Sequence, residues 1–255
     1  MNAEVWSQGT FVEDYTGTAL KQAEEVLIER HRRQLGGRVL ELGCGAGRAT
    51  GHLIEIAAHV HGLDISEGMV EHCRTRYPQA TFEVADIRDL SALSDGSFDA
   101  VLALANVLDV LGHEERARVL VGLARLLSPG ALLIFSSHNL AFAPRIPSPL
   151  RLPAAARGAG PRGLARELLA VPRRLRNRRR LRPFELRAPD HAVLVDEAHD
   201  YSLLHYYVSR EGQARALERA GYELLEALDM QGRTVAPGEA AASSSELHYV
   251  ARITR

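Results

Sequence analysis

The chain has 255 residues, a formal net charge of −1 at pH 7 and 25% charged residues. This length is sufficient for one α/β domain with a sizeable core and an added segment. No apolar run approaches the roughly 20 residues that span a bilayer, no basic-then-apolar signal segment opens the sequence, and the two cysteines show no spacing typical of a disulfide or zinc site. We therefore expect a cytoplasmic protein with both thiols reduced.

The first 36 residues are predicted to form an N-terminal arm and one helix. Tyr15 lies among polar residues in the arm, and apolar residues recur at helical spacing from Leu20 to Leu35. Gly36 and Gly37 follow, which is typical of the end of a helix. The sequence therefore predicts a helix in front of the first strand.

The stretch RVLELGCGAGR, from Arg38 to Arg48, contains the clearest functional motif. Residues 39–42 have the length and apolarity of a buried parallel strand, and a helical pattern begins at Ala49. Glycines at the turn between them allow positive φ angles and let a ligand approach the backbone closely. These glycines are Gly43, Gly45 and Gly47.

The spacing of the glycines disfavours a dinucleotide. A dinucleotide-binding loop has the pattern GxGxxG, which places pyrophosphate on the helix N-terminus. Counted from Gly43, the third glycine position of that pattern is Arg48. The loop is therefore predicted to bind a different ligand.

Strands and helices alternate after this loop. The predicted elements are a strand at 59–65, a helix at 67–77, a strand at 81–86, a strand at 98–104, a helix at 113–127 and a strand at 131–137. Such alternation is typical of a parallel sheet with right-handed crossovers.

An acidic residue ends each of the first three predicted strands. These residues are Glu41, Asp64 and Asp86. Because the carboxyl ends of parallel strands meet at one edge of a sheet, we expect the three carboxylates to face a common crevice. For Asp64 an alternative is an acidic residue that stabilises the helix beginning near Ser66.

The pattern ExGxGxG, which starts at Glu41, resembles motif I of the class I S-adenosylmethionine-dependent methyltransferases. The resemblance implies an α/β fold with a Rossmann-like, seven-stranded, mostly parallel sheet and helices on both faces. It also implies S-adenosyl-L-methionine as the cofactor. In this frame the basic segment described below is a helical insertion after the fifth strand.

The resemblance implies roles for individual residues. Asp64 would accept the ribose hydroxyls, Asp86 would contact the adenine amino group, and Ile65 and Ile87 would lie against the adenine. An aromatic hydroxyl of the arm would reach the methionine carboxylate, and Tyr15 is the candidate, with packing of the arm as the alternative. The residues expected at the cofactor are Tyr15, Glu41, Gly43, Cys44, Gly45, Gly47, Asp64, Ile65, Asp86, Ile87 and Asn106.

The insertion is strongly basic. Between residues 140 and 190 there are 13 arginines and three acidic residues, a charge of about +10 that leaves the rest of the chain near −11. Leu164, Leu168, Val171 and Leu175 recur at helical spacing. Pro172 is expected to divide this segment into two short helices.

Three interpretations of the insertion remain open. It can be a lid that packs its leucines on the body, an anion site for a phosphate or carboxylate of the acceptor, or a basic amphipathic surface for anionic lipid or RNA. RNA is the weakest of these, because Phe184 alone is a poor platform for stacking bases.

The last part of the chain is predicted to complete the sheet. HDYSLLHYYVS, at 199–209, has the pattern of a strand, and a helix follows at 210–220. Residues 222–230 and 247–253 resemble the antiparallel final pair of the methyltransferase sheet. The small, polar residues between them, 232–245, are expected to form a mobile loop.

Two histidines are candidates for catalysis. His138 follows the fifth strand, where a general base would contact the acceptor, although a structural histidine at the strand end is the alternative. His205 shares strand phase with Tyr201 and Tyr207, so the three can line a pocket face or pack against a helix.

Missing motifs narrow the function. After the fourth strand the sequence is LANVLD, without the Asn/Asp-Pro-Pro-aromatic motif of enzymes that methylate planar amide or adenine nitrogens. It also lacks the cysteine of the covalent cytosine C5 mechanism. No Asp-Asn pair follows the fifth strand, which disfavours the divalent-metal catechol type. We therefore expect a metal-free methyltransferase that acts on an oxygen, or in second place an amine nitrogen, of a small-molecule acceptor. The alternative is a noncatalytic cofactor-binding protein that docks on anionic membrane or RNA through the Arg-rich insertion.

The expected organisation has four parts. They are an N-terminal arm and helix (1–36), an S-adenosylmethionine-binding core (37–139), an Arg-rich insertion or lid (140–200) and the C-terminal part of the core sheet (201–255). The acceptor lies in the part that the resemblance does not cover.

Overall fold

The computed structural model describes residues 19–145, 148–150 and 160–254. Tyr15 lies outside the described residues. The helices are α3 (Gln22–Arg30), α4 (Thr50–Leu53), α5 (Glu67–Arg76), α6 (His113–Leu126), α7 (Gly160–Leu181) and α8 (Arg210–Arg219). The short 3₁₀ helices are η1 (Gln34–Gly36), η2 (Val107–Val110), η3 (Leu140–Arg145), η5 (Arg182–Phe184) and η6 (Ala198–Tyr201). The strands are β1 (Arg38–Leu42), β2 (His59–Asp64), β3 (Thr81–Val84), β4 (Phe98–Ala103), β5 (Leu127–Asn139), β6 (Leu186–Arg187), β7 (His191–Val195), β8 (Leu204–Val208), β9 (Tyr222–Leu228) and β10 (Glu246–Ile253).

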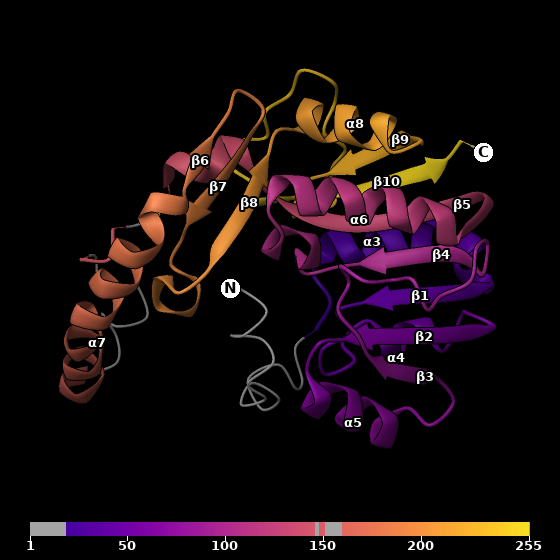
Figure 1. Cartoon of the computed structure of the whole chain (residues 1–255), viewed down its shortest axis with the longest axis horizontal. Helices are drawn as coiled ribbons and strands as arrows, with labels where there is room; N and C mark the ends of the chain where they lie inside the picture. Colours follow the sequence, from indigo (N-terminus) through magenta and orange to yellow (C-terminus); the bar gives the residue numbers. More distant parts are fainter. Residues whose placement is uncertain (1–18, 146–147, 151–159, 255) are drawn as a thin grey trace.

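Seven of these strands form the core of the sheet (Figure 1). Strands β3, β2, β1, β4 and β5 lie side by side in that order and are parallel. Strand β10 pairs antiparallel with β5, and β9 pairs antiparallel with β10. The expected Rossmann-like sheet, including its antiparallel final pair, is therefore confirmed.

Helices cover both faces of the sheet because successive residues of a buried strand point to opposite sides. Leu40 and Leu42 of β1 belong to the apolar cluster that contains Leu123 of α6. Val39, which precedes Leu40 and points to the opposite face, belongs to a second apolar cluster with Leu27 of α3. This alternation places the core on either side of one layer of strands.

The insertion adds strands to the same sheet. Strand β5 continues beyond the end of β4, and its last residues, His138 and Asn139, pair in parallel with Tyr207 and Val208 of β8. Strand β7 then pairs antiparallel with β8, and β6 with β7, which brings the sheet to ten strands. Strand β8 begins after residue 200, the expected end of the insertion, but it pairs with β7. The insertion therefore extends through β8 and is continuous with the sheet at the carboxyl end of β5.

The expectation that Pro172 divides the insertion into two short helices is wrong, because α7 runs unbroken from Gly160 to Leu181. Arg174 Nη2 lies 2.6 Å from Glu167 Oε2, so an ion pair spans the proline. Arg174 Nε also donates to Asp200 Oδ1 at 2.7 Å. These contacts hold the two halves of α7 in line on η6. None of the helices in the described ranges has the length and apolarity of a membrane-spanning segment.

The segment at 232–245 is a loop, as expected, but it is fastened to the sheet. Asn139 Nδ2 donates to the carbonyl oxygens of Ala240 and Ala241 at 3.0 Å and of Ser244 at 3.1 Å. Val235 N donates to Ala227 O of β9 at 2.8 Å. The amide of Asn139 therefore fixes this loop beside the end of β5.

A buried ion pair joins the elements around β5. Arg116 of α6 and Asp109 of η2 are 2% and 0% exposed, and Arg116 Nη1 donates to Asp109 Oδ1 at 2.7 Å. Arg116 Nη2 also donates to Gln213 Oε1 of α8 at 2.8 Å. Two charges removed from water in this way are tolerated only while both partners remain.

We expect Arg116→Met to lower the free energy of unfolding by about 3–5 kcal/mol, because it leaves the Asp109 carboxylate buried without its cation. Urea denaturation would measure the loss. Arg252→Ala is the matched control, since Arg252 pairs with Glu223 on the surface and its loss should cost less than about 1 kcal/mol. Equal losses in the two variants would contradict the importance of the buried pair.

Candidate active site

A cleft of about 950 Å³ lies along the carboxyl edge of the sheet. The ends of β1, β2 and β4 and the segment after β3 line one side, and η5, β6, β7 and β8 line the other. Of the residues predicted for the site, those that line this cleft are Glu41, Gly43, Cys44, Gly45, Asp64, Ile65, Asp86, Ile87, Asn106, His138 and His205. The fold thus brings most of the predicted residues to one cavity.

The glycine loop has the backbone conformation that its sequence predicts. Gly43, Gly45 and Gly47 have φ angles of +62°, +54° and +80°. A Cβ on Gly43 would lie 2.5 Å from a methyl group of Val107, and one on Gly47 would collide with the ring of Tyr77. No atom lies within 4 Å of the position of a Cβ on Gly45. Gly43 and Gly47 are therefore required by packing, whereas Gly45 leaves its backbone open to a ligand.

Asp64 organises this loop. Its Oδ2 accepts a hydrogen bond from Gly45 N, and its Oδ1 accepts one from Ser66 N, each at 2.9 Å. Burial raises the pKa of Asp64, against the effect of these two N–H groups. The carboxylate thus stabilises the start of α5, as the alternative interpretation states, and it also lines the cleft, where its contact with the ribose hydroxyls stays a prediction.

The other two strand-end acids have different surroundings. Glu41 is buried and accepts a hydrogen bond from Thr50 Oγ1 at 2.5 Å, and burial raises its pKa to about 7. Asp86 is partly exposed, and Arg88 donates to it from its backbone N and its Nε, at 2.9 and 3.0 Å to Oδ1. The Arg88 guanidinium holds the pKa of Asp86 below its usual range. Asp86 is therefore charged at neutral pH and already paired on one side.

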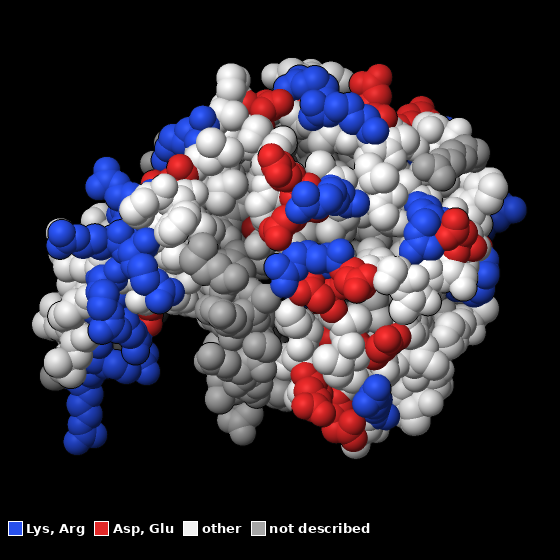
Figure 2. Space-filling model, viewed as in Figure 1, with Lys and Arg blue, Asp and Glu red and all other residues white. Residues whose placement is uncertain are grey.

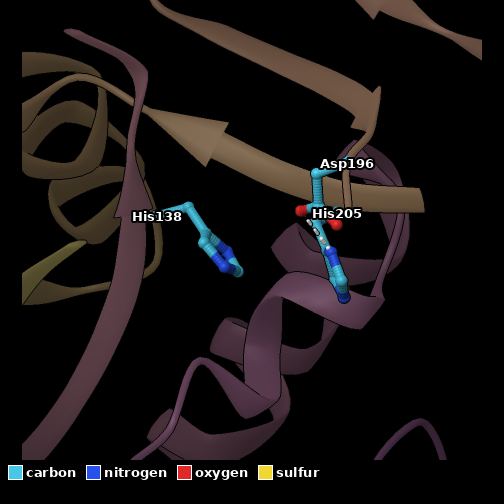
Figure 3. Close-up of side chains that lie close together, drawn as sticks. All are labelled: His138, Asp196 and His205. Atoms are coloured by element: carbon cyan, nitrogen blue, oxygen red, sulfur yellow. Dashed lines mark hydrogen bonds and ion pairs between the residues drawn. The ribbon is translucent and has the colours of Figure 1, made fainter. Parts of the chain in front are cut away.

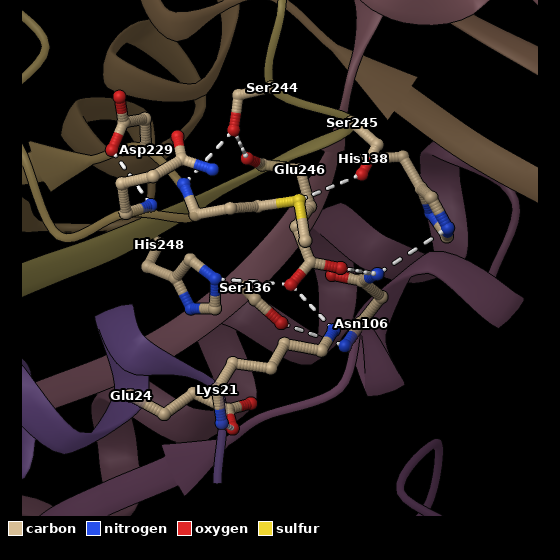
Figure 4. A network of polar contacts seen from close by, with 12 residues as sticks. Lys21, Glu24, Asn106, Ser136, His138, Asp229, Ser244, Ser245, Glu246 and His248 are labelled. Atoms are coloured by element: carbon tan, nitrogen blue, oxygen red, sulfur yellow. Dashed lines mark hydrogen bonds and ion pairs between the residues drawn. The ribbon is translucent and has the colours of Figure 1, made fainter.

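Asn106 belongs to a polar network that the sequence did not reveal (Figure 4). Its Nδ2 donates to Glu246 Oε2 at 2.8 Å and lies 3.4 Å from His138 Nε2. Glu246 Oε1 lies 2.5 Å from Lys21 Nζ and 3.1 Å from His248 Nε2. Burial opposes ionisation of Glu246, but His248 and Lys21 outweigh it and hold its pKa below its usual range. This network connects the start of α3 to the catalytic candidate His138.

His138 is held by the buried carboxylate of Asp109. Asp109 Oδ2 accepts from His138 N at 2.6 Å and lies 2.8 Å from His138 Nδ1. Because a carboxylate can only accept, this contact places the proton on Nδ1 and leaves the lone pair on Nε2. The side chain of His138 is 21% exposed and lines the cleft. Burial opposes its charged form, but Asp109 outweighs burial and raises the pKa of His138.

His205 forms a second imidazole–carboxylate pair opposite the first (Figure 3). Its Nδ1 lies 2.6 Å from Asp196 Oδ2, which also accepts from Tyr207 Oη at 2.9 Å. The rings of His138 and His205 are 5.1 Å apart between centroids. Side-chain atoms of His138, Asp196 and His205 lie within 4.8 Å of one another, a grouping that can hold a metal ion. Hydrogen bonds from His205, Tyr207 and the Ala198 N–H already satisfy the Asp196 carboxylate, and the expectation of a metal-free site stays a prediction.

The insertion supplies an apolar wall to the cleft. Phe184, Leu186, Val193 and Leu204 line this side. The expectation that the acceptor meets residues of the insertion thus remains a prediction that this geometry favours. The supporting acids Asp109, Asp196 and Glu246 were missed in the sequence, where they have no motif and no regular spacing from the histidines.

Residues 39–130 match the protein family described as "Methyltransferase domain". This part of the chain carries the glycine loop and strands β1 to β4, so the match supports the resemblance to the class I S-adenosylmethionine-dependent methyltransferases. The family's cofactor is S-adenosyl-L-methionine, as the resemblance implied.

Relatives and a solved structure agree with this class. A protein of Mycolicibacterium smegmatis named "Probable S-adenosylmethionine-dependent methyltransferase" is 34% identical over 129 residues, which cover 49% of this chain and 48% of the relative. A ubiquinone biosynthesis O-methyltransferase of Xanthomonas oryzae pv. oryzae is 32% identical over 109 residues, covering 41% and 44%. The chain thus spans just under half the length of these curated relatives. A methyltransferase from Mesorhizobium loti has the same fold, with a TM-score of 0.57, 21% identity and coverage of 90% of this chain and 97% of that one.

We expect Asp64→Ala to weaken S-adenosyl-L-methionine binding by at least about tenfold. The substitution removes the carboxylate that is expected to accept hydrogen bonds from the ribose hydroxyls, and hydrogen bonds to a charged group contribute about 1.5–3 kcal/mol each. Calorimetric titration would measure the dissociation constant. Asp95→Ala is the control, since Asp95 is exposed, pairs with Arg125 and lines no part of the cleft. Unchanged affinity in a folded Asp64→Ala protein would remove Asp64 from the cofactor site.

Proposed function

We propose that the protein transfers a methyl group from S-adenosyl-L-methionine to an oxygen atom of a small-molecule acceptor. The observation that carries this proposal is the Asp109–His138 pair, which presents an unprotonated ring nitrogen to the cleft beside the end of β4. A hydroxyl is a weak nucleophile until it loses its proton, so a base at this position has a direct use.

The residues along β1 and β2 fit the cofactor. Gly45 leaves its backbone accessible, Asp64 presents a carboxylate at the adjoining strand end, and Ile65 adds an apolar surface. When bound, S-adenosyl-L-methionine supplies an activated methyl group on a positively charged sulfur. The chain's own task is then to hold the acceptor oxygen in line with that methyl group and to exclude water, and such positioning can lower a barrier by about 7–11 kcal/mol.

His138 accepts the proton of the acceptor hydroxyl on Nε2. With that proton removed, the acceptor oxygen would be the nucleophile for the methyl group of a cofactor held beside Gly45, Asp64 and Ile65. Asp109 stabilises the imidazolium that results, and Arg116 and Ser137 keep the Asp109 carboxylate in place. We assign His205, whose ring lies near that of His138, to orienting the acceptor.

The choice of oxygen over an amine nitrogen has two supports. The Asp109–His138 pair suits a hydroxyl, and the Xanthomonas oryzae relative carries the name of an O-methyltransferase. The apolar wall from the insertion favours an acceptor with a hydrophobic portion. The proposed setting is the cytoplasm, since Cys44 and Cys73 are both free and buried.

Incubation of cell extract with the protein and methyl-labelled S-adenosyl-L-methionine should yield a labelled small molecule. Mass spectrometry would detect it, and the carbon chemical shift of the labelled methyl group would distinguish an O-methyl from an N-methyl product. Label only on nitrogen would contradict the oxygen assignment. Absence of any labelled product would favour the noncatalytic alternative.

On that acceptor, His138→Asn should lower kcat by about 10²–10⁴, the usual contribution of a general base. The dissociation constant of S-adenosyl-L-methionine should stay within about twofold of the original, because His138 acts on the acceptor. His59→Asn is the control, since His59 is exposed at the first residue of β2, whereas the cleft lies at the other end of that strand. Full turnover by His138→Asn would exclude His138 from the mechanism.

The pH dependence of kcat should reflect the raised pKa of His138. Protonated His138 cannot accept a proton, so kcat should fall as the pH drops through a pKa above the ordinary value of 6.5. Asp109→Asn removes the carboxylate that favours the charged ring and should move this acid limb to lower pH. Stopped-time assays across pH would measure both profiles, and circular dichroism would verify that the variant is folded. An identical acid limb in the two proteins would refute the pairing of Asp109 with His138.

A further inference from the structure

The insertion exposes an unusual number of large apolar side chains. Ten large hydrophobic residues are exposed among the described residues, and seven of them lie in the insertion. These seven are Leu150, Leu164, Leu168, Leu169, Leu175, Phe184 and Leu186. Because contiguous exposed apolar surface is rare on a monomeric protein in water, such a concentration indicates a binding surface.

Arginines cover the same helix. Figure 2 shows blue side chains along the outer part of the molecule that α7 forms. No described carboxylate lies within ion-pair distance of Arg162, Arg176, Arg179 or Arg180. We name residues 160–187, which comprise α7, η5 and β6, the basic arm.

Most of these side chains form two separate stripes on α7, although Leu169 lies within the arginine stripe. Leu164, Leu168 and Leu175 are separated by four and seven residues and therefore form one stripe. Arg162, Arg166, Arg173, Arg176 and Arg180 are spaced by three, four and seven residues and form another. Both stripes are exposed.

A third face attaches α7 to the body. Asn177 Nδ2 donates to Asp200 O at 3.0 Å, Arg174 pairs with Asp200, and Leu181 is 1% exposed. The leucine stripe is therefore not needed for attachment. The body holds the helix so that both other faces remain available.

We propose that the basic arm docks on the surface of an anionic lipid bilayer. Guanidinium groups suit lipid phosphates, because their planar donors match phosphate oxygens. Leucines beside them enter the boundary between headgroups and acyl chains, which is the usual arrangement of an interfacial amphipathic helix. A nucleic acid would use the arginines but would give the exposed leucines no apolar environment.

The position of the basic arm connects docking to the cleft. Phe184 and Leu186, at the end of the arm, are 57% and 47% exposed and also line the cleft. A docked arm therefore brings the apolar wall of the cleft to the lipid surface. Resting on the proposed function, this indicates an amphiphilic acceptor whose hydroxyl enters the cleft while its apolar part remains near the bilayer.

Vesicle flotation with the full chain tests the docking directly and needs no turnover. The probes are vesicles of phosphatidylcholine alone and of phosphatidylcholine mixed with phosphatidylglycerol. We expect binding only to the mixed vesicles, weakening as salt is raised. No binding to the mixed vesicles at low salt, or equal binding to both kinds, would overturn the proposal.

Two variants separate charge from apolar contact. Combined Arg176→Gln, Arg179→Gln and Arg180→Gln should weaken binding about 100-fold, while equal neutralisation at Arg32, Arg33 and Arg219, elsewhere on the surface, should change it little. Combined Leu164→Ser, Leu168→Ser and Leu175→Ser should weaken it at least about tenfold. Loss with the arginine variant but full binding by the leucine variant would mean a purely electrostatic anion contact and would overturn docking in a bilayer.

Cofactor binding provides the separate readout. Arg176, Arg179 and Arg180 do not line the cleft, so the arginine variant should bind S-adenosyl-L-methionine as the original protein does. Failure of vesicle binding with normal methyl transfer would refute docking alone. Normal vesicle binding without methyl transfer would refute the proposed function alone.

Discussion

The carboxylate of Asp109 is the group on which both the fold and the candidate site depend. It is fully buried, so it must be surrounded by donors, and Arg116, Ser137 and the backbone and ring of His138 supply them. These partners come from α6 and β5, whose apolar residues belong to the same core cluster. The interaction that makes a buried charge tolerable therefore also fixes the orientation and tautomer of the imidazole in the cleft.

A second buried carboxylate extends this arrangement toward the N-terminal helix. Glu246 of β10 contacts Lys21, the single lysine of the chain, and receives a hydrogen bond from Asn106. Beside it, the buried Glu24 of α3 pairs with Arg48 at the end of the glycine loop. Arg48, which stands where a dinucleotide-binding loop has its third glycine, therefore forms an ion pair with Glu24. Charged contacts rather than apolar packing alone connect α3 to the cofactor edge.

The insertion is joined to the core where catalysis is proposed. Strand β8 reaches β5 only through the pairs His138–Tyr207 and Asn139–Val208. This short ladder places His205 opposite His138 and carries the apolar wall of the cleft with it. The segment that distinguishes this chain from the shared methyltransferase core is therefore positioned by the same two residues that end the core strand. Changes in the insertion can alter the acceptor side of the cleft without affecting the glycine loop.

The sequence by itself determined the alternating strands and helices, the glycine loop and the convergence of Glu41, Asp64 and Asp86 on one edge. Apolar periodicity and turn residues are local properties that can be read in the sequence. The geometry of the parallel sheet that they predict then brings the strand ends to one edge. Only the tertiary structure decided that α7 passes unbroken through Pro172, that the sheet continues into the insertion, and that Asp109, Asp196 and Glu246 support the site. These features arise from contacts between residues distant in the chain, such as Glu246 with Asn106. Burial gives such contacts their strength, and burial exists only once the chain has folded.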